Sequence, residues 1–321
     1  MLSRLVLVFS ALLALVPGCS ESGSSDASPP TDSTPTEIAE EVLTTFYPAT
    51  FFAERIADGL VPVVNPLAGL GDPATARPDT ETIARYQNAR VVVVNGADFE
   101  RWVRTAPLAR SRTVDASAGF EDRFITFKTR THSHGTGGEH THEGTDGHTW
   151  MDPTLAIEQV RAIEAGLARG FPEHEDAFEA NAAALVVELR GLDERFRLLT
   201  SELGSATLLS NHPAYAYTAR TYGWDIADLD LDPESTDPAG VVAAVREALG
   251  DAEGPDPRLL LWESEPTDAI RDRLLNDLGV VSVVFSPIES RPDTGDFVSQ
   301  MRENVARLRA AIVGVSPQDL D

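Results

Sequence analysis

Residues 175–203, EDAFEANAAALVVELRGLDERFRLLTSEL, form the longest helical pattern in the chain and decide its predicted architecture. Large apolar side chains recur along this stretch at helical spacing, at Phe178, Leu185, Leu189, Leu192 and Phe196. No proline interrupts it, and Gly191 is its only glycine. Because most helices in globular proteins have about a dozen residues, a helix of about thirty is unusual. We interpret it as a rigid connector between two lobes.

Alternating strand and helix patterns lie on both sides of this connector. Before it, strands are predicted at 41–46, 61–65, 90–95 and 112–116, with helices at 48–58, 79–89 and 153–169. After it, strands are predicted at 206–210, 226–231, 258–262 and 280–285, with helices at 214–222, 238–249, 267–278 and 296–313. Uninterrupted apolar runs such as RVVVVN at 90–95 are typical of parallel strands covered on both faces. The predicted fold class is therefore α/β, with two Rossmann-like lobes that each hold a parallel sheet. Ligands of such folds bind outside the carboxyl ends of the strands, here between the lobes.

The N-terminal residues precede this pattern and predict export. A basic Arg4 and an apolar run at 5–16 are typical of a signal peptide. The run ends in Val-Pro-Gly-Cys, which resembles a bacterial lipobox and makes Cys19 the expected site of lipidation. An ordinary secretory signal with a stray cysteine is the alternative. The predicted organisation is a lipoprotein signal peptide at 1–19, a disordered tether at 20–36, an N-terminal lobe at 37–174, the connector at 175–203 and a C-terminal lobe at 204–321.

The composition narrows the classes of function. The formal net charge is −25, which argues against nucleic acid as a partner, because nucleic acids require basic patches. Cys19 is the only cysteine, so thiolate metal sites and structural disulfides are excluded from both lobes. We expect a monomer in the cell envelope, on the periplasmic or extracytoplasmic side, that is attached to the membrane by its lipid anchor.

The segment at 131–150, THSHGTGGEHTHEGTDGHTW, indicates metal binding. It holds five of the seven histidines, namely His132, His134, His140, His142 and His148. Neutral imidazole is the commonest protein ligand for zinc-like metals. We expect a His-rich loop at 131–149, in which His148 is the best-placed ligand because a predicted helix begins just after it. A flexible, weak metal scavenger without a single geometry is the alternative for the whole cluster.

Two further candidates follow predicted strands of the second lobe. His212 lies in SNHP, directly after the strand at 206–210, and Glu263 lies in WESEP, after the strand at 258–262. Both are expected to be metal ligands, although a helix cap for His212 and an acidic helix start for Glu263 are the structural alternatives. Asp72 before Pro73 is interpreted as a turn residue, and His174 as a solvated surface residue.

Three stretches carry a family resemblance: ARVVVVNGADFERW, GHTWMDP and SNHPAYAYTARTYGW. They resemble the solute-binding proteins of bacterial zinc and manganese ABC transporters, in the family's order and across residues 40–315. The resemblance implies two α/β lobes joined by one rigid helix and a cleft-bound metal that is delivered to a membrane permease.

The resemblance also implies four metal ligands, of which this chain retains two. His148 and His212 match the family's second and third histidines. The first histidine, in an Asp-Pro-His motif, is matched by Ala74, and the late aspartate by Ser286. Since zinc in closed sites takes about four ligands, we expect histidines of the 131–149 loop to fold into the cleft and, together with Glu263, to replace the missing pair.

The leading hypothesis is a binding protein without catalytic activity that delivers Zn²⁺ to an ABC permease. Zinc is favoured over manganese because the candidate ligands are mostly histidines, whereas manganese prefers oxygen donors. The first alternative is a secreted zinc-dependent hydrolase with Glu263 as the base, although no His-Glu-x-x-His helix or nucleophile elbow is present. The second alternative is a periplasmic metal buffer without a permease.

Overall fold

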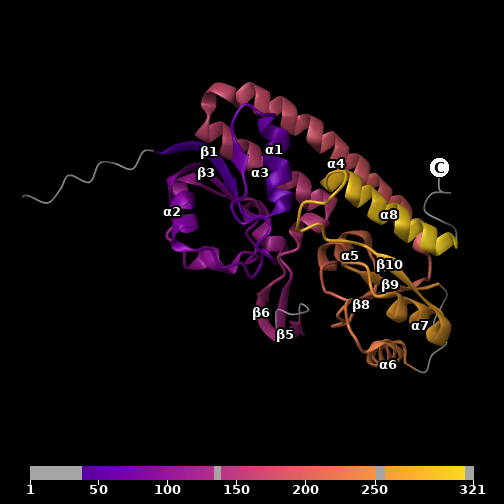
Figure 1. Ribbon diagram of the computed structural model, residues 1–321. Helices are drawn as coiled ribbons and strands as arrows, with labels where there is room; N and C mark the ends of the chain where they lie inside the picture. The colour runs from indigo at the N-terminus through magenta and orange to yellow at the C-terminus, as the bar shows by residue number, and fades with distance from the viewer. Residues whose placement is uncertain (1–37, 134–138, 251–256, 315–321) are drawn as a thin grey trace, which may run out of the picture. The chain divides into compact units, whose positions relative to one another are not determined.

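The structure is a computed structural model that describes residues 38–133, 139–250 and 257–314, with the backbone alone for 128–133 and 139–143 (Figure 1). The predicted signal peptide, its Cys19, the tether and His134 lie outside these residues. Within the described part, no helix has the length and apolar character needed to cross a membrane.

The first lobe is built on a parallel sheet with the order β2-β1-β3-β4. Its strands are β1 (Ala39–Thr44), β2 (Val63–Val64), β3 (Ala89–Val94) and β4 (Thr113–Asp115). Because successive residues of a strand face opposite sides, Val91 and Val93 pack with α1 (Tyr47–Ala57) and α3 (Pro153–Gly170). The alternate residues Val92 and Val94 pack on the other face with Tyr86 of α2 (Thr80–Asn88). The apolar run at 90–95 is therefore covered on both faces, as predicted.

The second lobe repeats this plan with the strand order β10-β9-β7-β8, again all parallel. Its strands are β7 (Thr207–Ser210), β8 (Ile226–Asp228), β9 (Arg258–Trp262) and β10 (Val280–Val284). Leu259 and Leu261 of β9 face the core shared with α4 (Glu175–Leu203), α5 (Ala216–Tyr222) and α8 (Phe297–Val313). Leu260 faces α6 (Pro238–Leu249) and α7 (Asp268–Leu278).

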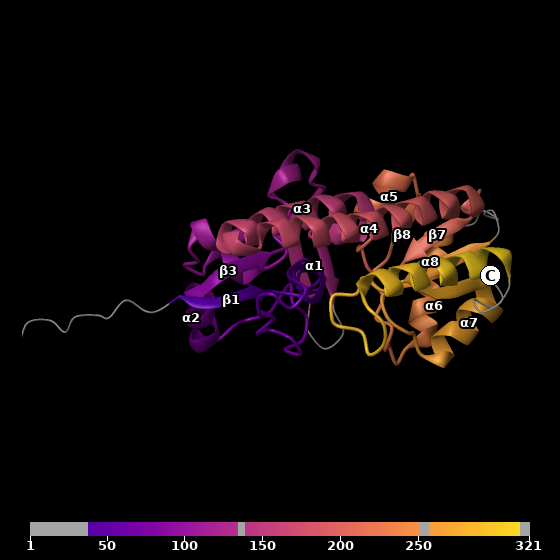
Figure 2. The same ribbon diagram turned by 90° about the horizontal axis from the view of Figure 1, so that it is seen from above.

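The predicted connector is confirmed as α4, a single helix of 29 residues that runs beside both lobes (Figure 2). Its apolar face packs against α1 and α3 of the first lobe and against α8 of the second. The same hydrophobic core holds Phe178 near the start of α4 and Phe196 near its end. Because one continuous core crosses from lobe to lobe within the unit Glu37–Asp321, the cleft between the lobes is held by buried packing.

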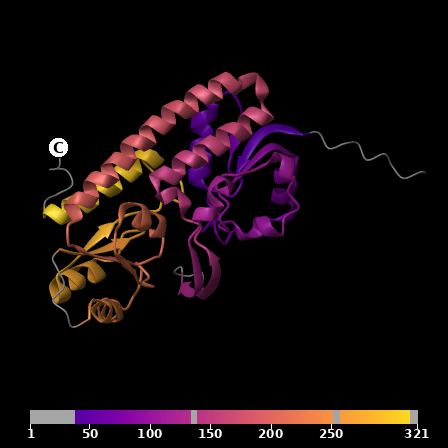
Figure 3. The ribbon, with the colours of Figure 1, turned by 180° about the vertical axis from the view of Figure 1, so that it is seen from behind.

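The backbone of the His-rich segment forms an antiparallel hairpin of β5 (Thr126–Ser133) and β6 (Glu139–Thr145), where a loop was predicted (Figure 3). Its register pairs His132 with His140 and Arg130 with His142. A loop was predicted because the segment is rich in glycine. However, threonines alternate with its histidines, and β-branched residues favour strands.

The packing of the first-lobe core can be tested where α3 lies closest to the sheet. A Cβ atom added to Gly166 of α3 would lie 2.2 Å from Cγ2 of Val114 in β4. We expect Gly166→Ala to lower the free energy of unfolding by about 2 kcal/mol, as overpacking typically does. Urea denaturation of the metal-free protein measures this. Gly191→Ala on α4, where nothing lies within 4 Å of the new Cβ, is the control and should not destabilise; equal stability of both variants would contradict the packing.

Candidate metal centre

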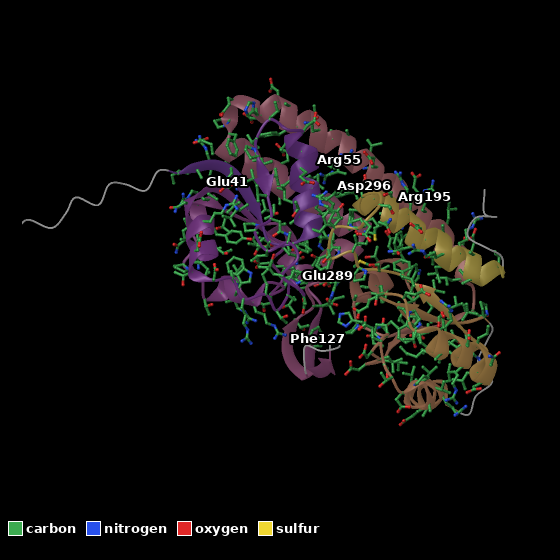
Figure 4. All side chains as sticks on the ribbon, viewed as in Figure 1. Glu41, Arg55, Phe127, Arg195, Glu289 and Asp296 are labelled. Atoms are coloured by element: carbon green, nitrogen blue, oxygen red, sulfur yellow. The ribbon has the colours of Figure 1, made fainter. Side chains whose placement is uncertain are left out.

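A cavity of about 80 Å³ lies at the cleft and is lined by residues of both lobes. The first lobe contributes Ala74 and His148, and the second contributes His212 and Glu289. His212 directly follows the carboxyl end of β7, as the fold predicts, and Glu289 lies in the segment between β10 and α8. Figure 4 places Glu289 between the lobes and Phe127 at the base of the hairpin. The structure thus brings together His148 and His212, which are 64 positions apart in the sequence, with ring centroids 5.4 Å apart.

His148 is held by its own turn so that one ring nitrogen faces the cavity. The carboxylate of Asp146 accepts hydrogen bonds from the backbone N–H of His148 at 2.9 Å and from its Nδ1 at 2.8 Å. With Nδ1 engaged as the donor, Nε2 points to Glu289, whose Oε1 lies 3.3 Å away. A carboxylate behind a histidine fixes the tautomer and strengthens the other nitrogen as a metal ligand.

The spacing of these atoms fits a zinc ion. Two ligand atoms at about 2.05 Å from a tetrahedral zinc lie about 3.3 Å from each other, and Nε2 of His148 lies 3.3 Å from Oε1 of Glu289. The rings of two histidine ligands would have centroids about 5 Å apart in the same geometry, compared with 5.4 Å for His148 and His212. His212 is buried, with 5% of its surface exposed. Among the residues described, no three His, Cys, Asp or Glu side chains are gathered closely enough to hold a metal.

The residue matched to the first family histidine, Ala74, is part of the cavity wall. Ala74 lines the cavity and supplies no donor atom. The adjacent carboxylate of Asp72 is engaged in its own turn, where it accepts from Ala74 N at 2.8 Å and from Thr75 Oγ1 at 2.9 Å. The interpretation of Asp72 as a turn residue is therefore confirmed.

Glu289 is the functional candidate that the sequence reasoning missed, since the late carboxylate was sought at Ser286. Ser286 is tied to Asn304 through its backbone N–H and C=O and does not line the cavity. Between them, Ile288 has φ 59°, a left-handed conformation that is strained for a β-branched residue. This turn carries Glu289 to the cavity. The available signal was a carboxylate in the segment after a strand, five residues beyond the end of β10.

Glu263 does not line the cavity, although it follows β9 as predicted. Its backbone N–H donates to Oδ1 of Asn211 at 2.9 Å, which fixes this loop beside the end of β7. The role of Glu263 as a metal ligand stays a prediction, whereas Glu289, after the neighbouring strand β10, is a carboxylate that lines the cavity.

The base of the hairpin meets the cavity, where Phe127 and Thr145 are lining residues. At about 3.4 Å per residue, His142 lies about 10 Å along β6 from Thr145, and His140 about 17 Å. His132 is paired with His140 in the register and is equally distant. The side chains of these histidines lie outside the described part, so their entry into the cleft stays a prediction.

The charge state of His148 predicts a proton exchange on metal binding. Burial opposes protonation, but the hydrogen bonds and negative charges of Asp146 and Glu289 raise the pKa of His148 to about 10. His148 is therefore protonated in the metal-free protein at pH 7.5. The attraction between its imidazolium and the carboxylates of Asp146 and Glu289 stabilises the fold. This stabilisation is fully present below pH 6.5 and is lost as the pH rises through 10. A metal at Nε2 must displace this proton.

We expect about one proton to be released per bound zinc at pH 7.5, and the zinc affinity to fall about tenfold per pH unit on acidification. Calorimetric titration in buffers of different ionisation enthalpy measures the proton count. Binding without proton release would contradict the role of His148.

Comparisons with known proteins match this chain to zinc-uptake and zinc-binding proteins. The family model described as zinc-uptake complex component A, periplasmic, matches residues 42–311. The zinc-binding lipoprotein AdcA of Streptococcus pneumoniae is 28% identical over 285 residues, which are 84% of this chain and 55% of AdcA. The chain thus spans about half the length of this relative. The high-affinity zinc uptake system protein ZnuA of Bacillus subtilis is 24% identical over 327 residues, which are 95% of this chain and 96% of that protein.

Solved structures share the fold. Zn(II)-bound AdcA of Streptococcus pneumoniae matches with a TM-score of 0.70 at 23% identity, over 85% of this chain and 57% of that chain. The metal-dependent lipoprotein YcdH of Bacillus subtilis matches with a TM-score of 0.69 at 21% identity, over 85% of this chain and 99% of that chain. The two-lobed architecture predicted from the sequence is therefore confirmed.

Proposed function

Since the chain belongs to the zinc-uptake complex component A family, we propose that it binds Zn²⁺ between its lobes and delivers it to the permease of an ABC importer. The observation that carries the proposal is the 3.3 Å separation between Nε2 of His148 and Oε1 of Glu289, the spacing of two ligands on one tetrahedral zinc. His212 from the second lobe is the third ligand. The metal is cargo in this account, and no catalytic step is involved.

Zinc suits this ligand set better than manganese, because two of the three protein ligands are imidazoles. The fourth position faces Ala74 and is open to a water molecule. The alternative of a secreted hydrolase loses its expected base, since Glu263 does not line the cavity. A buffer that works without a permease uses the same site and differs only in its partner.

We place the protein on the extracytoplasmic side of the membrane, as a monomer anchored through Cys19. The lipobox-like Val-Pro-Gly-Cys at 16–19 supports this placement, as does the description of AdcA of Streptococcus pneumoniae as a lipoprotein. A polar tether at 20–36 would let the lobes reach the permease.

Metal titration tests the proposed function. The chain without residues 1–19 is titrated with Zn²⁺ and with Mn²⁺ against a chromophoric chelator. The proposal expects one tight equivalent of zinc, with a Kd in the nanomolar range or below, and much weaker binding of manganese. A zinc Kd weaker than about 1 μM, or a preference for manganese, would overturn it.

The hairpin histidines are proposed as a separate, weaker site that collects metal. This rests on the backbone register, which pairs His132 with His140, and on the distance of about 17 Å between this pair and the base of the hairpin. His134 and His142 belong to the same proposed cluster.

Replacing the tip of the hairpin distinguishes this proposed weak site from the cleft site. We expect replacement of residues 130–142 by an Asn-Gly turn to leave the tight zinc equivalent within about threefold of the parent Kd and to abolish the additional weak equivalents. Equilibrium dialysis with zinc quantified by atomic absorption measures both. A loss of the tight equivalent would show instead that a hairpin histidine completes the cleft site, as expected from the sequence.

A further inference from the structure

The hydroxyl of Tyr217 occupies an unusual place between the two lobes. Tyr217 lies in the first turn of α5 in the second lobe, five residues after His212, and its side chain is fully buried. Its Oη accepts a hydrogen bond from the backbone N–H of Ile125 at 3.2 Å and donates one to the backbone C=O of Asp146 at 2.7 Å. Both of these partners belong to the first lobe.

Ile125 and Asp146 are the residues that directly flank the β5–β6 hairpin. The N–H of Asp146 donates to the C=O of Ile125 at 2.8 Å, which is one half of the two-bond exchange between hydrogen-bonded residues of antiparallel strands. In the other half, the Tyr217 hydroxyl stands between the Ile125 N–H and the Asp146 C=O. A side chain of the second lobe is thus inserted into the base of a hairpin of the first lobe.

The same Asp146 supports the zinc ligand. Its backbone carbonyl receives the Tyr217 hydroxyl, and its carboxylate accepts from Nδ1 of His148. Asp146 is itself buried, with 3% of its surface exposed. Whatever rotates the Asp146 peptide therefore also moves the carboxylate that orients His148.

We propose that Tyr217 is a positioning residue for the zinc site. Its hydroxyl holds the hairpin base open by the width of one oxygen atom and so keeps the Asp146 carboxylate in line with His148. Without the hydroxyl, the Ile125 N–H is free to bond directly to the Asp146 C=O, which completes the ordinary strand pair and turns the carboxylate away. The proposal rests on the proposed zinc binding at His148.

Hydrogen bonds of neighbouring α5 residues limit the effect of losing the Tyr217 hydroxyl to the base of the hairpin. Thr218 donates to the C=O of Met151 at 2.8 Å, and Thr221 donates to Oδ2 of Asp152 at 2.6 Å. These bonds keep α5 docked on the segment after His148 when the Tyr217 hydroxyl is absent. The lobes therefore stay together in Tyr217→Phe, and the change is limited to the hairpin base.

The test compares Tyr217→Phe with the matched variant Tyr86→Phe. Tyr86 is also buried, and its hydroxyl also donates to a backbone carbonyl, that of Thr44 at 2.8 Å, but it packs in the first-lobe core with Val92. Urea unfolding of both metal-free variants shows whether their losses of stability are matched. Zinc Kd values come from competition with a chelator.

We expect Tyr217→Phe to weaken zinc binding about tenfold, in the range seen for residues that support metal ligands, and Tyr86→Phe to keep the parent Kd. Equal Kd values for the two variants, beside a tight parent, would overturn the proposal alone. A parent that binds no zinc would instead remove the proposed function, and this proposal with it.

A second background identifies the route of the effect. In the chain with residues 130–142 replaced by an Asn-Gly turn, the hairpin base is retained but the tip histidines are absent. The tenfold effect of Tyr217→Phe is expected to persist there, because it acts through Asp146. If the effect vanishes in this background, Tyr217 acts through the tip histidines and the proposal is wrong.

Discussion

Replacing His212 by alanine is expected to weaken zinc binding by about two orders of magnitude. Zinc sites with four protein ligands bind with about 12 kcal/mol, so one ligand contributes about 3 kcal/mol, which is about a factor of 100 in Kd. His212 is the only ligand candidate of the β7 loop and is buried at the cavity, so no neighbouring side chain of that loop replaces it. Chelator competition measures the Kd of the variant.

His174→Ala is the matched control for this experiment. His174 follows α3 and packs against Phe178 at the start of α4, with ring centroids 5.8 Å apart, and it does not line the cavity. The substitution removes the same chemical group and should leave the Kd unchanged. Similar losses in both variants would indicate a general effect on the fold, and an unchanged Kd in His212→Ala would remove His212 from the ligand set.

Introducing a histidine at Ala74 is expected to tighten zinc binding by up to about a hundredfold. The three proposed protein ligands leave one tetrahedral position open, and Ala74 lines the cavity beside it. A fourth imidazole would add about 3 kcal/mol by the same reasoning, reduced by the entropy of ordering the new side chain. Chelator competition measures the change in Kd, and dissociation of zinc should slow in parallel.

Ala68→His is the matched control for Ala74→His. Ala68 lies in the same segment between β2 and α2 but is exposed and does not line the zinc cavity. A histidine there should leave the Kd of the tight site unchanged. If Ala74→His also leaves it unchanged, the open position does not face Ala74, and the resemblance that matched Ala74 to a ligand position misplaces the metal.

Much of the fold follows from local patterns in the sequence. The run RVVVVN at 90–95 became β3, and the helical spacing of Phe178, Leu185 and Leu189 became α4. Asp152 caps α3 by accepting from Thr154 N, as its place before Pro153 indicated. These features depend on periodicity and on capping, which a single sequence displays directly.

Only half of the proposed site was predictable, for reasons of backbone geometry. His148 and His212 were found because each stands next to a recognisable helix or strand end. Glu289 reaches the cavity through a left-handed turn at Ile288. A β-branched residue rarely adopts this conformation, so the sequence did not indicate the turn. Glu263 follows a central strand, but Asn211 fixes its loop. The hairpin was missed because its glycines outweighed its threonines in the prediction.

We propose that His148, His212 and Glu289 together hold one zinc ion between the lobes. Anomalous diffraction at the zinc absorption edge tests this, with crystals of the chain in which an Asn-Gly turn replaces residues 130–142, loaded with one equivalent of Zn²⁺. We expect a single strong peak about 2.0–2.2 Å from the two histidine nitrogens and the Glu289 carboxylate. A cleft without a peak, or a peak bound by other side chains, would contradict it.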